Sequence, residues 1–241
     1  MAEPVLMIRD LTASYGKERI LSGVSLSVNP GEVLCIAGES GSGKTSLLSA
    51  ICGNPELFVE SGIITFQGKE LTALSGAERR RLMGAGIGLI PQNPAGSFNP
   101  LRRLEVQFRE TLDSHGIPFD REEILATFSS IGLAEPEKLL RSRPYELSGG
   151  MNQRIAIAFA MLLKPALLLC DEVTSALDVT TAITVIEELQ RLQREQKMTM
   201  LFVTHHLGLA RRIADRIAVM VRGEIVETGT AEEVLTVPTH A

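Results

Sequence analysis

The part of this 241-residue sequence that most constrains its fold reads Val33-Leu34-Cys35-Ile36-Ala37-Gly38-Glu39-Ser40-Gly41-Ser42-Gly43-Lys44-Thr45. The first five residues are all apolar, which is typical of a central strand buried on both faces. Gly41 and Gly43 then allow the backbone to turn so that its N–H groups face an anion, and a helix predicted from Ser46 adds its positive N-terminal dipole. This order of strand, glycine-rich loop and helix predicts a phosphate-binding loop.

Two side chains at the end of this loop indicate a nucleoside triphosphate bound with a metal ion. Lys44 is expected to reach the β- and γ-phosphates, and the Thr45 hydroxyl is expected to bind Mg²⁺. A flexible surface turn is the structural alternative, which the flanking strand and helix disfavour. Expected nucleotide contacts are Gly38, Glu39, Ser40, Gly41, Ser42, Gly43, Lys44, Thr45 and Ser46.

An acidic pair follows a second apolar strand. The run 166–170 ends in Asp171 and Glu172, and ligands of doubly wound sheets gather at the carboxyl ends of strands. Asp171 is expected to hold Mg²⁺ through its water shell, which leaves Glu172 free to polarise an attacking water. The pair alone could cap a helix, but the phosphate loop upstream favours hydrolysis.

Composition limits the compartment and the partners. The net charge of −5 argues against nucleic acid as the main partner, because phosphate binding needs a clustered basic surface. The one dense basic run, 79–81, is predicted to be a solvated helix face. Cys35, Cys52 and Cys170 are widely spaced and predict buried thiols in a reducing compartment. Neither a signal peptide nor an apolar run of spanning length is visible, so any membrane association is expected to be peripheral.

The remaining pattern predicts an α/β fold with a parallel sheet covered on both faces. Strands near the N-terminus predict an antiparallel β subdomain, and a helical lobe is expected at about 94–145, inserted in the α/β core of a single domain, 1–241. The turn 222–223 predicts a hairpin. Strands are expected at 5–12, 24–28, 33–37, 63–67, 87–90, 166–170, 199–204, 217–221 and 225–227, and helices at 46–52, 101–115, 121–131, 135–141, 150–163, 179–195 and 207–214.

A tetrad upstream of the acidic pair narrows the class of NTPase. It reads Leu147-Ser148-Gly149-Gly150, at the start of a predicted helix. The N–H groups of Ser148, Gly149 and Gly150 would offer a second anion site, away from the phosphate loop. Two sites for one triphosphate make sense if they meet across a head-to-tail dimer.

This tetrad resembles the signature of ABC-type ATPases, and nearly the whole chain resembles an ABC transporter ATP-binding subunit. The family's pieces occur in order as Tyr15, 38–45, Gln92, 147–151, Asp171-Glu172 with 175–178, and His205.

The resemblance implies that the nucleotide is ATP and assigns roles to these pieces. Tyr15 would stack on adenine, Gln92 would touch Mg²⁺ and the attacking water, and His205 would contact the γ-phosphate. By itself, Tyr15 is as compatible with an ordinary surface or core role, and a lone histidine such as His205 is more often structural. The expected catalytic residues are then Glu172, His205 and Gln92, and the expected metal group is Thr45, Gln92 and Asp171.

A subfamily is suggested by 91–100, which resembles the segment after the glutamine in importers of oligopeptides, dipeptides and nickel. The segments 177–180, 232–235 and 238–240 point the same way. The implied function is ATP hydrolysis that powers import of peptides, nickel or metal chelates at the cytoplasmic face of the inner membrane. The implied partners are a second ATP-binding subunit, identical or paralogous, transmembrane permease subunits and, indirectly, an extracytoplasmic substrate-binding protein.

Two positions depart from the family pattern, and two alternatives compete with transport. Met151 replaces a usual glutamine, and Val173 replaces a usual proline beside the catalytic carboxylate; we expect activity to be retained. The chain stops at Ala241, which fits a short, nickel-type form or a trimmed chain. A soluble ABC ATPase of repair or translation is disfavoured by the single module without heptads. A regulatory module with little turnover is disfavoured by the intact Lys44, Asp171, Glu172 and His205.

Overall fold

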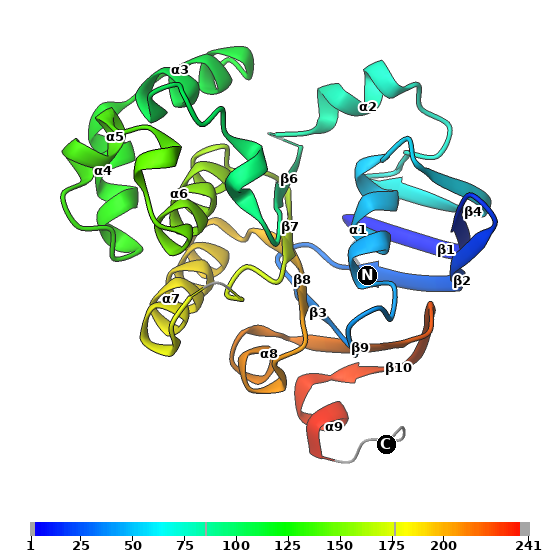
Figure 1. Ribbon diagram of the computed structural model, residues 1–241. Helices are drawn as coiled ribbons and strands as arrows, with labels where there is room; N and C mark the ends of the chain where they lie inside the picture. Colours follow the sequence, from blue (N-terminus) through cyan, green and yellow to red (C-terminus); the bar gives the residue numbers. More distant parts are fainter. Residues whose placement is uncertain (1–2, 85, 176, 237–241) are drawn as a thin grey trace.

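The computed structural model describes residues 3–84, 86–175 and 177–236. Its centre is a six-stranded sheet with the order β10-β9-β3-β8-β7-β6, in which the β9–β10 pair is antiparallel and the other neighbours are parallel (Figure 1). The strands are β3 (Val33–Ala37), β6 (Ile87–Ile90), β7 (Leu167–Asp171), β8 (Thr199–Thr204), β9 (Arg216–Val221) and β10 (Glu224–Thr230). The predicted hairpin at 222–223 is confirmed.

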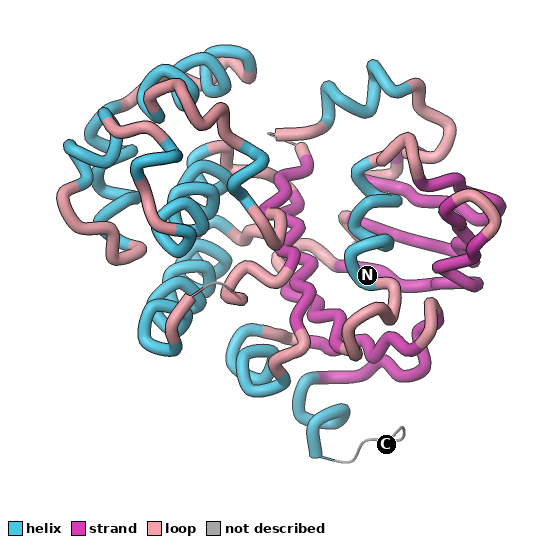
Figure 2. Tube along the Cα trace, in the orientation of Figure 1, coloured by secondary structure: helices cyan, strands magenta, loops and turns pink. Residues whose placement is uncertain are grey.

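Both faces of this sheet are covered, as predicted. Side chains of β3 alternate between two buried clusters, since Leu34 and Ile36 face one and Cys35 and Ala37 face the other. Helix α1 (Lys44–Cys52) packs on the first face. Figure 2 shows the central strands between α1 and a group of helices on the opposite side. That group includes α6 (Gly149–Leu162), α7 (Val179–Gln196) and α8 (Leu207–Ile213).

A second sheet is antiparallel, with the order β2-β1-β4-β5. Its strands are β1 (Leu6–Tyr15), β2 (Glu18–Val28), β4 (Leu57–Phe66) and β5 (Lys69–Glu70). The expected antiparallel subdomain is therefore present, and its first two strands are longer than the alternating pattern suggested. Helix α1 lies between this sheet and the central one, so that the two sheets share one apolar cluster (Figure 1).

Three helices fill the segment between β6 and α6. They are α3 (Leu104–Ser114), α4 (Arg121–Ser130) and α5 (Pro136–Arg141), with short 3₁₀ turns η1 (Pro94–Ser97) and η2 (Pro144–Glu146) at either end. Aromatic rings join them to α6, because Phe108 lies 5.7 Å from Phe128 and 4.5 Å from Phe159 between ring centroids. The buried side chains of this segment belong to the same apolar cluster that covers one face of the central sheet.

Two short polar elements, β5 and α9 (Ala231–Thr236), were not predicted, whereas the helix predicted around 79–81 is present as α2 (Gly76–Leu82). Helix α2 begins with a capping box, in which Ser75 and Glu78 satisfy each other's backbone N–H groups. The basic run on α2 is only partly the predicted solvated face: Arg80 and Arg81 are exposed, whereas Arg79 is half-buried and donates to the Ala50 carbonyl at 3.1 Å.

The cysteines are free thiols, as predicted. Cys35 and Cys170 are fully buried and Cys52 is partly buried. Burial raises the pKa of Cys35 to about 12 and that of Cys52 to about 11. Among the described helices, none combines the length and the apolar character needed to cross a bilayer.

Replacing Phe108 by Ala is expected to destabilise the chain by about 3–5 kcal/mol, because a fully buried ring between two other rings is removed. The free energy of unfolding from urea titration measures this. Val106→Ala on the same helix, with a side chain 40% exposed, is the control and should change that free energy by less than about 1 kcal/mol. Equal effects of the two substitutions would contradict the assigned core.

Candidate nucleotide-binding and hydrolysis site

The phosphate loop connects β3 to α1 and bends at two glycines with left-handed backbone. Gly41 has φ 80° and Gly43, the residue before the helix, has φ 107°. A side chain has no room at Gly38, where a Cβ would lie 2.3 Å from the Met220 carbonyl oxygen. The loop therefore requires glycine for two reasons: Gly41 and Gly43 allow the turn, and Gly38 allows the close approach to β9.

Lys44 is buried at the start of α1 and points into its own loop. Its ammonium donates to the carbonyl oxygens of Gly38 at 2.8 Å and Glu39 at 2.5 Å, and to Ser42 Oγ at 3.3 Å. Burial lowers the pKa of Lys44, and the charges of Glu172 and Asp171 oppose that shift. The loop thus holds a cation where the sequence predicted phosphate contacts.

Thr45 and Asp171 meet across the sheet edge. The Thr45 hydroxyl donates to Asp171 Oδ1 at 3.1 Å. Burial is the main cause that raises the pKa of Asp171, while the hydrogen bond from Thr45 acts in the opposite direction. A hydroxyl and a carboxylate side by side are the hard oxygen ligands that Mg²⁺ takes together with waters and substrate phosphates. Among the described residues there is no cluster of three His, Cys, Asp or Glu side chains arranged as a metal cage.

The three residues expected to be catalytic lie together. Gln92 Nε2 donates to Glu172 Oε2 at 2.8 Å, and His205 Nδ1 lies 3.0 Å from Glu172 Oε1. Each carboxylate oxygen of Glu172 therefore has one side-chain partner. Glu172 follows β7, Gln92 follows β6 and His205 follows β8, so all three come from the carboxyl ends of neighbouring strands.

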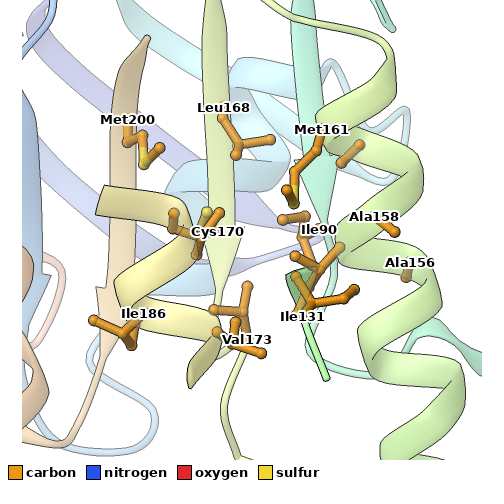
Figure 3. Close-up of a cluster of buried hydrophobic side chains, with 14 of the residues drawn as sticks. Ile90, Ile131, Ala156, Ala158, Met161, Leu168, Cys170, Val173, Ile186 and Met200 are labelled. Carbon is orange, nitrogen blue, oxygen red and sulfur yellow. The ribbon is translucent and has the colours of Figure 1, made fainter. Parts of the chain in front are cut away.

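The buried side chain of Val173 anchors the backbone next to Glu172. Its side chain is fully buried, in the same cluster as Ile131 and Ile186 (Figure 3). Glu172 itself has left-handed backbone, with φ 46°. A residue before proline favours extended backbone, so valine at 173 is compatible with this conformation and also fills the core.

The signature forms the start of α6, as predicted. Ser148 is the residue before the helix, and its hydroxyl accepts from the Met151 N–H at 3.2 Å. Ser148 and Gly149 are exposed. In the loop 175–178, Ser175 is exposed and Asp178 caps α7 by accepting from the Thr181 N–H at 3.0 Å. Ala176 and the segment 238–240 lie outside the described residues.

A cavity of about 810 Å³ adjoins the phosphate loop. The loop residues 38–42 and His205 line one side, and β9, β10 and α9 line the other. Within the described chain, the signature contributes no residue to it. Tyr15 does not line it either and packs, partly buried, against the core of the antiparallel sheet. The walls from β9 and α9, including Val219, Val221 and Val234, were not anticipated, because apolar residues in short elements look like ordinary core.

The sequence of residues 21–175 matches the ABC transporter family model. The chain belongs to this family. It is 41% identical to the peptidoglycan transport ATP-binding protein YejF of Agrobacterium fabrum, over 99% of this chain and 46% of that protein. It is 38% identical to the oligopeptide transport ATP-binding protein OppD of Bacillus subtilis, over 98% of this chain and 69% of that protein. The chain therefore spans about half of the first relative and about two thirds of the second.

Solved structures of ABC ATPases share the fold. The dimeric bacterial ABC transporter cassette MJ0796 superposes with a TM-score of 0.84 at 26% identity, covering 94% of this chain and 98% of that one. A dimeric post-hydrolysis state of the same cassette, bound to ADP and Pi, also gives 0.84, at 27% identity. These agreements confirm the predicted ABC-type α/β fold.

Replacing Thr45 by Val removes the hydroxyl that meets Asp171 while keeping the shape of the side chain. We expect Mg²⁺-dependent ATP binding to weaken by about 1.5–3 kcal/mol, because a contact to a charged group is lost. Titration of a fluorescent ATP analogue with and without Mg²⁺ measures this, and binding without Mg²⁺ should change little. Thr181→Val, whose hydroxyl bonds to Asp178 on α7, is the control. Equal weakening with and without Mg²⁺ would contradict the metal assignment.

Proposed function

We propose that this chain is the ATP-hydrolysing subunit of an ABC importer, acting as one nucleotide-binding domain with a helical lobe at about 94–145. The observation that carries the proposal is the carboxylate of Glu172, bonded on one oxygen by Gln92 and on the other by His205. A carboxylate oriented at the end of a strand beside a phosphate loop is the arrangement that hydrolysis of a bound triphosphate needs.

Lys44 is the residue that we assign to the triphosphate. Its present partners are carbonyl oxygens of Gly38 and Glu39, and phosphate oxygens would replace them with stronger, charge-assisted bonds. Neutralising a partly desolvated cation favours this exchange, since burial already lowers the pKa of Lys44. The N–H groups of 38–46 complete the phosphate contacts, and Tyr15 is proposed to stack on adenine.

Thr45, Asp171 and Gln92 are the residues that we assign to Mg²⁺, which would neutralise charge on the β- and γ-phosphates when bound. Gln92 uses its amide N–H on Glu172, which leaves its amide oxygen for the metal or the water. Glu172 then accepts a proton from the water as it attacks. His205 contacts Glu172 and lines the cavity beside the loop, and we assign it the contact with the γ-phosphate.

The exposed signature is proposed to serve the ATP of another chain. Ser148 with Gly149 and Gly150 starts a 14-residue helix and takes no part in the cavity of its own loop. A second ATP-binding subunit, a copy or a paralogue, would bring its loop against this helix. The dimeric cassette with the same fold supports this arrangement. The machine would also include permease subunits and, indirectly, an extracytoplasmic substrate-binding protein, and would hold this chain peripherally at the cytoplasmic face of the inner membrane.

Peptide-type cargo is favoured over nickel or metal chelates. The relatives that support this are named for transport of peptidoglycan, oligopeptides and dipeptides, the last being DppD of Bacillus subtilis at 36% identity over 99% of this chain and 74% of that protein. These names disfavour a soluble ABC ATPase of repair or translation.

Replacing Glu172 by Gln is expected to leave ATP binding intact while lowering ATP turnover at least about a hundredfold, because the water loses its base. Turnover is measured by phosphate release and binding by a fluorescent analogue, and ATP should hold the variant as a dimer in size-exclusion chromatography. Glu187→Gln, an exposed carboxylate on α7, is the control. Normal ATP turnover in the Glu172→Gln variant would contradict the assignment of Glu172 as the base.

Replacing Ser148 by Arg is expected to separate binding from hydrolysis. The arginine would block the approach of another chain's triphosphate, and Ser148 does not line the cavity beside the phosphate loop of its own chain. ATP affinity of the isolated chain should stay within about twofold, while turnover of the assembled protein falls at least about a hundredfold. If both quantities fell together, the signature would act within its own chain.

A further inference from the structure

Gln153 is a polar residue that is buried among apolar side chains of α6. It lies on α6, has no exposed surface, and its Nε2 donates to the backbone carbonyl of Val173 at 3.1 Å. Its Oε1 is buried without a hydrogen-bond partner. A buried amide with one unsatisfied oxygen destabilises a fold relative to a well-packed apolar side chain, so stability alone does not account for glutamine here.

The bond from Gln153 joins two functional segments of the same chain. Val173 follows Glu172, the proposed base, whereas Gln153 is three residues after the signature glycine Gly150. The contact therefore connects the helix that carries the signature with the loop that carries the carboxylate, across 20 residues of sequence.

Asn152, the residue before Gln153, connects the same helix to the segment that leads into the signature. Asn152 is also buried, and its Nδ2 donates to the carbonyl oxygen of Pro144 at 3.0 Å and to that of Leu147 at 3.5 Å. Two consecutive side chains on one helical turn thus hold the backbone before the signature and the backbone after Glu172. A displacement of this turn would move both.

The backbone of the loop after β7 is held by hydrogen bonds and by one buried side chain, so a displacement of the loop would also move Glu172. The Glu172 N–H donates to the Val203 carbonyl at 3.0 Å, and its carbonyl accepts from the Ser175 N–H at 2.9 Å. The side chain of Val173 is fixed in the buried cluster of Figure 3. Glu172 has the uncommon left-handed backbone, a conformation that persists only when its surroundings enforce it. The Val173 carbonyl held by Gln153 is one of those surroundings.

We propose that Gln153 is a positioning residue that couples the signature of this chain, which serves the ATP of another subunit, to Glu172, which serves the chain's own ATP. The inference rests on the proposed function. When the signature engages a neighbour's triphosphate, the first turn of α6 shifts, and Gln153 carries that shift through the Val173 carbonyl to the base. The two ATP sites of the dimer are thereby coupled within each chain.

The test replaces Gln153 by Met, which keeps length and volume but removes the donor. The protein is captured with its membrane complex through an affinity tag on this chain, and ATP turnover is measured against ATP concentration. We expect kcat to fall about tenfold or more, because small misplacement of a catalytic group is costly. KM for ATP should stay within about twofold, and the Hill coefficient should fall to that of independent sites. Gln153→Asn, whose amide is one methylene shorter, should give the same pattern with a smaller loss of kcat.

Gln190→Met is the matched control. Gln190 also donates from its side-chain amide to a backbone carbonyl, that of Arg212, and the bond joins α7 to α8 through two residues that are not assigned to the ATP site. Its kcat and Hill coefficient should equal those of the wild type. Unchanged kcat and Hill coefficient in Gln153→Met would overturn the inference. So would a parallel loss of ATP binding, melting temperature and kcat in both Gln153 variants, since that marks a purely structural residue. A wild-type complex without ATP turnover would instead overturn the proposed function, and the inference with it.

Discussion

Four parallel strands end at one edge of the central sheet, and the site depends on this constraint. The registers pair Ala37 with Thr204, Asp171 with Val203, and Ile90 with Cys170. The residues that follow these strands must therefore meet, although they are spread along the sequence from position 44 to position 205. Lys44, Gln92, Glu172 and His205 are brought together by strand pairing before any contact between their side chains forms.

Two buried groups of opposite charge lie at this edge of the sheet. Lys44 and Asp171 are both buried, and burial disfavours the charged form of each. Their opposite charges and the Thr45 hydroxyl offset part of that penalty. In the proposed function, a triphosphate with Mg²⁺ would supply anions for the ammonium and a cation for the carboxylate. Ser148 of the same chain begins α6 and does not line the cavity beside the phosphate loop, and neither do Lys44 and Glu172.

Much of the fold could be predicted because the central strands are apolar on both faces. The bounds of β3, β6 and β8 match the expected ones, since continuous runs such as Val33–Ala37 leave no choice of buried face. The elements that were missed, α9 and β5, are short and have little or no buried apolar surface to mark them. Capping of α2 by Ser75 was visible in the sequence only as a serine three residues before a glutamate.

The individual site residues were predicted from motifs, but the contacts between them were not. No spacing rule predicts that Gln153 reaches the Val173 carbonyl, because that contact depends on how α6 lies against β7. The half-buried position of Arg79 over the end of α1 has the same origin.

The central claim, that this chain supplies half of two sites, is tested most directly by cross-linking between chains. Two separate Glu172→Gln proteins, one with Ser148→Cys and one with Ser40→Cys, are mixed and treated with a short bis-maleimide. The account predicts a species of dimer mass that requires both cysteines and ATP. A cross-link at monomer mass in a chain carrying both cysteines, with none between chains, would contradict it.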